Sequence, residues 1–117
     1  MKGNARQRYG RFCQDNSWWL DDYALFVNLR ERFELRLWNT WPGGLDRREP
    51  AALENARREF AGDIAIAKAI QFAFWEQWRA LHLAAQERGI RIIGDVAIFV
   101  SYDSADVWTC PELFRLN

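Results

Sequence analysis

The sequence between Ile90 and Val100 is rich in β-branched residues and mostly apolar on both alternating faces. This pattern is typical of a strand in a parallel sheet that is covered on both sides. The run therefore predicts one buried strand near residues 90–100. A single strand preceded by helices cannot form a sheet, so its partner strands must come from another chain or from a larger protein.

Asp95 interrupts the apolar run. A carboxylate among aliphatic side chains is costly unless it is hydrogen-bonded or faces a cleft. More polar and aromatic side chains follow the run: Ser101, Asp103, Ser104, Asp106 and Trp108. Because α/β proteins bind ligands at the carboxyl ends of their strands, we expect a ligand-binding site here.

The first three quarters of the chain favours helices. Apolar residues recur every three or four positions over 19–33 and over 60–85, which indicates helices with one core-facing side. Pro50 suits a first helical turn, and Gly89 suits the left-handed residue after a helix. Gly62 is expected to kink or split the second helical region. Helix, glycine and strand together indicate an α/β class.

Charge and hydropathy argue against several classes of protein. Sixteen basic residues balance sixteen acidic ones, which argues against binding to nucleic acid or to an anionic membrane. No apolar run approaches the ~20 residues of a membrane span. The polar start, Met1 to Gly10, does not resemble a secretory signal, so we expect a cytoplasmic protein.

Cysteine and histidine usage points away from metal or redox chemistry. Cys13 and Cys110 are far apart in the sequence and are expected to be reduced thiols. His82 is the sole histidine and lies within a helical pattern, which excludes most histidine-based triads and metal sites. We therefore expect no cofactor and no metal.

Tryptophan is abundant, with seven residues in 117. Most of these side chains are expected in the core, although flat indole faces also stack on sugars and nucleobases. Trp38 and Trp41 precede the loop-forming sequence Pro42-Gly43-Gly44. They either pin this loop to the body or line a ligand groove, and we favour pinning.

Three blocks of the sequence carry a resemblance: Trp19-Leu-Asp-Asp-Tyr-Ala-Leu-Phe26, Gln71-Phe-Ala-Phe-Trp-Glu-Gln-Trp78, and Arg91-Ile-Ile-Gly-Asp-Val-Ala-Ile-Phe-Val100 with Asp103-Ser-Ala-Asp-Val-Trp108. They resemble the 4-alpha-glucanotransferases (amylomaltases, disproportionating enzymes) of glycoside hydrolase family 77. The resemblance runs from about Phe12 to the end of the chain and covers an interior minority of a complete enzyme.

The resemblance implies a mostly helical partial segment of a (β/α)8 TIM barrel, with one buried strand near residues 90–100. Residues 1–117 would be an incomplete piece of the catalytic barrel, with a helical insertion region at about 12–88 and a barrel strand and active-site loop at about 90–117. Asp95 would hold the sugar or orient the catalytic carboxylates. Asp103, Ser104 and Trp108 would be further substrate-binding residues on the following loop.

The family reaction transfers α-1,4-glucan segments between maltooligosaccharides with retention, which needs two carboxyl groups about 5 Å apart. The resemblance implies that the nucleophile and the general acid lie outside this chain, so no catalytic residue is assigned and the chain alone should be inactive. Its exposed apolar faces should self-associate.

Two alternatives stay open from the residues alone. One is a stand-alone helical interaction module, in which the cluster around Asp95 only caps a turn. The other is an anion- or nucleotide-binding α/β unit, which we do not favour because no glycine-rich loop follows the predicted strand and the acidic residues would repel phosphate.

Overall fold

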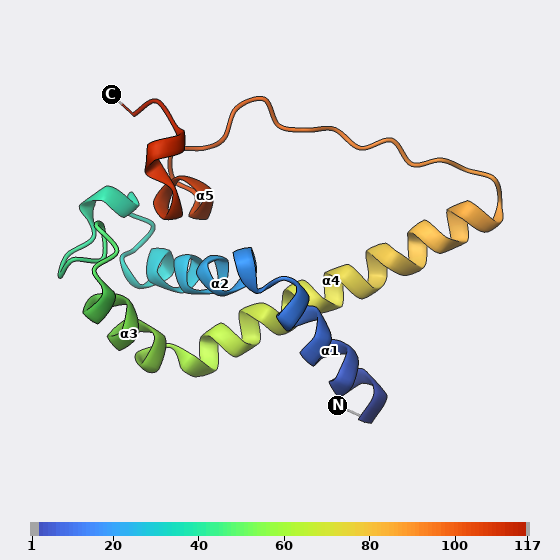
Figure 1. The fold of residues 1–117 in the computed structure, drawn as a ribbon, viewed down its shortest axis with the longest axis horizontal. Coiled ribbons are helices and arrows are strands. Elements are labelled where there is room, and N and C mark those ends of the chain that lie inside the picture. Colours follow the sequence, from blue (N-terminus) through green and yellow to red (C-terminus); the bar gives the residue numbers. More distant parts are fainter. Residues whose placement is uncertain (1–2, 117) are drawn as a thin grey trace.

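The structure is a computed structural model that describes residues 3–116 as helices joined by loops (Figure 1). Met1, Lys2 and Asn117 lie outside the described residues, so part of the basic N-terminal stretch is not covered. The elements are α1 (Gly3–Asp15), α2 (Ser17–Arg32), the 3-10 turn η1 (Trp38–Thr40), α3 (Pro50–Glu59), α4 (Ala61–Glu87), α5 (Ala105–Thr109) and η2 (Pro111–Leu113).

The predicted buried strand near residues 90–100 is wrong, and residues 3–116 contain no strand. The segment instead runs as an irregular connection from the end of α4 back to α5 (Figure 1). Its apolar side chains are exposed, with Ile93 at 93% and Phe99 at 91%. A strand exists only when a neighbouring strand accepts and donates its backbone hydrogen bonds, and the described residues supply none. The α/β class predicted from this run therefore fails for the same reason.

The helical predictions are largely confirmed. Helix α3 begins at Pro50 as expected, and the break expected at Gly62 lies two residues earlier, at Phe60, between α3 and α4. After α4, Gly89 adopts a φ of +68°, the left-handed conformation that glycine tolerates best. One difference lies at the start, because α1 begins at Gly3, before the helical region expected at about 12–88.

The main core forms where α2 meets α3, α5 and the loop between α2 and α3. Trp108 is 1% exposed and packs against Phe26 and Trp41, with ring centroids 5.8 and 5.5 Å away. The other buried members of this core are Leu25, Leu29, Trp38, Leu53, Ala56 and Val107. The burial of Trp38 and Trp41 confirms that these tryptophans pin the loop to the body.

A smaller core joins α1, α2 and α4 through Phe12, Leu20 and Phe72. Tyr9 packs edge-on against Phe72, with centroids 5.5 Å apart. Desolvation by burial raises the pKa of Tyr9 to about 12, with smaller contributions from a hydrogen bond and a Coulombic interaction with Cys13. This core is small because α4 contributes a single buried residue to it, Phe72.

Much of α4 therefore presents apolar side chains that the described residues leave uncovered. Ile66, Ile70 and Phe74 are each at least 60% exposed and follow one another at a spacing of four, on one side of the helix. The radius of gyration is 16.9 Å, against about 13 Å for a compact chain near this length. The extended shape follows from α4 and the connection after it (Figure 1). Within the described part of the chain, no helix is long and apolar enough to cross a membrane.

Trp108 gives the first testable prediction. Trp108→Ala should lower the free energy of unfolding by roughly 3–5 kcal/mol, as expected for removal of a buried large aromatic side chain. Trp108→Phe should cost less, roughly 1–3 kcal/mol, because most of the packing stays while the Leu45 carbonyl loses its indole donor.

Chemical denaturation of the complete protein that carries this segment measures both values. Trp18→Ala is the matched control, because Trp18 is 80% exposed and its removal should change stability by less than about 0.5 kcal/mol. Equal effects at positions 18 and 108 would contradict the assigned core.

Candidate functional site

The polar cluster after residue 100 is held against η1 by an aromatic contact. The indole N–H of Trp38 donates to the carbonyl of Tyr102 at 2.8 Å, and the two rings stack with centroids 5.2 Å apart. Because Trp38 is buried, this contact fixes the backbone just before Asp103. The loop tryptophan thus positions the cluster from a point 64 residues earlier in the chain.

Asp103 forms an ion pair with α2. Its Oδ2 accepts a hydrogen bond from Nε of Arg30 at 2.8 Å, and its side chain is 11% exposed. Its other oxygen, Oδ1, is buried and has no hydrogen-bond partner among the described residues. Since a buried carboxylate oxygen without a partner is costly, Asp103 retains one acceptor that a donor group could fill.

Ser104 caps the start of the short helix α5, and Trp108 lies within that helix. The Ser104 hydroxyl accepts from the backbone N–H of Val107 at 3.3 Å and donates to the carbonyl of Ser101 at 2.6 Å, which makes it an N-cap. The indole N–H of Trp108 donates to the carbonyl of Leu45 at 2.9 Å. Both side chains are therefore engaged within the fold, and the Trp108 ring offers no open face in this structure.

Arg48 covers the Trp108 ring and was not singled out from the sequence. Its guanidinium carbon lies 4.3 Å from the ring centroid, and its Nη2 donates to Asp22 at 3.0 Å. Its φ of +55° is uncommon for a residue with a side chain. The cation–π contact holds the loop before α3 over α5, and the ion pair with Asp22 ties the same loop to α2.

Asp95 stands apart from the other predicted site residues. It is exposed, and its Oδ1 accepts the backbone N–H of the next residue, Val96, at 3.0 Å. No hydrogen bond or ion pair within residues 3–116 joins its side chain to the cluster on α5. The structure thus brings Asp103, Ser104 and Trp108 together and leaves Asp95 on the exposed connection.

Arg30 and Arg48 are the residues that sequence reasoning missed. Arg30 lies in a helix and Arg48 in a loop, and in both places the sequence predicts an ordinary solvated basic side chain. Their roles depend on partners far away in the sequence, so no local pattern indicates them. Across residues 3–116, no group of three or more histidine, cysteine, aspartate or glutamate side chains is arranged to hold a metal ion.

Known proteins match the chain over nearly its whole length. The profile of the 4-alpha-glucanotransferase family, glycoside hydrolase family 77, matches residues 1–117. A 4-alpha-glucanotransferase of Thermus thermophilus is 44% identical over 112 residues, which are 96% of this chain and 22% of that protein. One of Aquifex aeolicus is 43% identical over 91% of this chain and 22% of its own length.

A solved structure agrees with the sequence matches. The structure of an amylomaltase from Streptococcus agalactiae in complex with acarbose aligns with a TM-score of 0.90 and 36% identity, over 99% of this chain and 23% of that one. By class, these relatives are glucan-transferring enzymes. The chain belongs to the 4-alpha-glucanotransferase family, and it spans about a fifth of the length of its curated relatives.

The family membership confirms the resemblance found in the sequence blocks and does not favour the stand-alone interaction module. A relative from Oryza sativa, 36% identical over 99% of this chain, is named as chloroplastic/amyloplastic. The cytoplasmic location of this chain therefore stays a prediction.

The Arg30–Asp103 pair gives a prediction that a double-mutant cycle can test. Arg30→Met should destabilise the complete protein by roughly 1–3 kcal/mol, because it leaves the 11% exposed carboxylate of Asp103 without its cation. Asp103→Asn should cost less, because the Arg30 side chain that it leaves is 42% exposed and can be solvated. Their coupling energy should exceed about 1 kcal/mol.

The control cycle uses Arg32 and Glu59, whose side chains are 58% and 56% exposed at a separation of 3.5 Å. A solvated pair of this kind should couple by less than about 1 kcal/mol. Equal coupling in the two cycles would show that Asp103 is not held as the structure indicates.

Proposed function

We propose that the protein carrying this segment transfers α-1,4-glucan segments between maltooligosaccharides by a retaining double displacement. Family membership across all 117 residues is the observation that carries this proposal. The structural relative, the amylomaltase of Streptococcus agalactiae, forms a complex with acarbose. A retaining transfer needs two carboxyl groups about 5 Å apart, one as nucleophile and one as acid and base.

We assign no catalytic residue to this segment, whose proposed contribution is scaffold and one wall of the sugar site. Asp95 is the proposed sugar contact, because its carboxylate is exposed and makes a hydrogen bond only to its neighbour's backbone within residues 3–116. An ionised carboxylate accepts hydrogen bonds from sugar hydroxyls and is acceptor-only, which suits a polyol ligand. The segment by itself is proposed to be inactive.

Asp103, Ser104 and Trp108 form the supporting part of the same wall. Asp103 keeps one buried oxygen without a hydrogen-bond partner among the described residues, and this oxygen is the proposed acceptor for a sugar hydroxyl. Ser104 and Trp108 are proposed to hold α5 in place, because Ser104 caps this helix and Trp108 anchors it to the core. The helical region at about 12–88 supplies the frame, and residues 90–117 bring the site residues to it.

Asp95→Asn separates a functional role from a structural one. In the complete enzyme, this change should lower the rate of maltotriose disproportionation by roughly tenfold or more, since a charged acceptor is replaced by a neutral one. Stability should change by less than about 0.5 kcal/mol, because the side chain is exposed.

Asp15→Asn is the matched control, because Asp15 is a 65% exposed carboxylate on α1. It should leave both rate and melting temperature unchanged. Wild-type activity in the Asp95→Asn variant would remove Asp95 from the site.

The uncovered apolar side of α4 predicts self-association of the isolated segment. Residues 1–117 alone should bind a hydrophobic dye and form oligomers, because an apolar stripe and the connection at 90–100 lie open. Replacing Ile66, Ile70 and Phe74 together by glutamine should reduce dye fluorescence and shift sedimentation toward monomer. A monomeric segment that does not bind the dye and that unfolds in a sharp two-state transition would contradict this proposal.

A further inference from the structure

We infer that α2 and the α5–η2 turn form a binding site for one neutral glucosyl unit, with Trp18 as its stacking platform. This inference rests on the proposed function for the source of the ligand, an α-1,4-glucan. It assigns a role to an exposed indole and a carboxylate that the main core does not use. Neither Trp18 nor Asp106 belongs to the buried cluster around Trp108.

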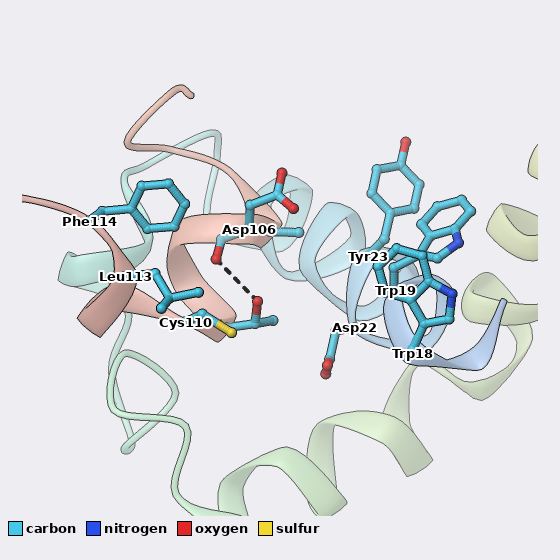
Figure 2. A pocket seen from close by; sticks show the side chains of 10 residues that line it. Trp18, Trp19, Asp22, Tyr23, Asp106, Cys110, Leu113 and Phe114 are labelled. Atoms are coloured by element: carbon cyan, nitrogen blue, oxygen red, sulfur yellow. Dashed lines mark hydrogen bonds between the residues drawn. The ribbon is translucent and has the colours of Figure 1, made fainter. Parts of the chain in front are cut away.

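Figure 2 shows the pocket between the two elements. Its cavity volume is about 280 Å³, near the lower end of the roughly 300–1,000 Å³ typical of ligand pockets. One wall is aromatic and comes from α2, and the other comes from α5 and the turn after it (Figure 2). The residues that the argument uses are Trp18, Trp19, Tyr23, Asp106, Thr109 and Leu113.

The aromatic wall is rigid on one side and open on the other. The indole N–H of Trp19 donates to Asn16 at 2.9 Å, and its ring lies 5.9 Å from that of Tyr23. Trp18, which meets Trp19 edge-on, is 80% exposed. An exposed indole beside a fixed aromatic pair offers a flat apolar face, which the C–H face of a sugar ring can cover.

The opposite wall supplies hydrogen-bond groups. The Asp106 side chain is exposed, and no partner for its carboxylate is found within residues 3–116. The Thr109 hydroxyl donates to the backbone carbonyl of Asp106 at 3.2 Å and keeps its own lone pairs for an incoming hydroxyl. An aromatic platform facing a carboxylate and a hydroxyl fits a hydroxyl-rich ligand.

The negative charge of the pocket disfavours anionic ligands. Asp22 lines the same pocket, but it is paired with Arg48 at 3.0 Å and Arg57 at 3.7 Å. No lysine or arginine is among the described residues that line the pocket, so an anion would meet the Asp106 charge without a cation to bind. A neutral sugar avoids this repulsion, and the small volume favours a single ring.

The test follows the indole N–H resonance of Trp18 in the complete enzyme, assigned by its loss in Trp18→Phe. The probe is methyl 4,4′-dithio-α-maltotrioside, in which sulfur replaces the oxygen of both linkages between glucose units, so that neither is transferred. The Trp18 resonance should shift to saturation, and Asp106→Ala should raise the Kd roughly tenfold. Asp15→Ala, which removes an exposed carboxylate on α1, should leave the Kd unchanged.

Sodium gluconate at the same concentration should not move the Trp18 resonance, because its carboxylate is repelled. A Trp18 resonance that the thio-sugar leaves unmoved, or that gluconate moves equally, would overturn the inference. Disproportionation of ordinary maltotriose is measured in parallel. A saturable shift without transfer would overturn the proposed function alone, whereas transfer without a shift would overturn this site alone.

Discussion

The burial of Trp108 is the contact on which the rest of the structure depends. Its indole joins α5 to α2 through Phe26, to the loop before α3 through the Leu45 carbonyl, and to Arg48 through its face. A helix of five residues is not stable by itself, because nucleation costs more than so few backbone hydrogen bonds return. The polar cluster at the start of α5 therefore depends on this side chain, together with the contacts that Trp38 makes with Tyr102 and Arg30 with Asp103.

How much of the fold could be predicted depended on the range of the interactions. Helices α2 and α4 have apolar side chains at helical spacing, and the end of α4 has a suitable glycine, so local patterns sufficed there. The predicted strand at 90–100 failed because an apolar run indicates a preference for burial and carries no information on a partner. In residues 3–116 no partner is present, and the side chains lie exposed.

The candidate site divides in the same way. The sequence could indicate that Asp103, Ser104 and Trp108 lie close together, because they span six residues after a break in the pattern. It could not indicate that Arg30 pairs with Asp103, since 73 residues separate them and the arginine lies in an ordinary amphipathic helix. Nor could it distinguish a tryptophan that contacts sugar from one that is 1% exposed in a core. Those differences arise only from tertiary packing.

The two carboxylates of the predicted site, Asp95 and Asp103, differ in whether their substitution changes stability as well as activity. Contacts within residues 3–116 fix Asp103, so its replacement changes stability together with any binding it supports. Those contacts do not fix Asp95, whose side chain bonds to its neighbouring backbone N–H and is otherwise exposed. Because stability is insensitive to an exposed side chain, an activity change at Asp95 is attributable to the site itself. Substitution of Asp95 therefore tests function more directly, and substitution of Asp103 tests the packing of the helices more directly.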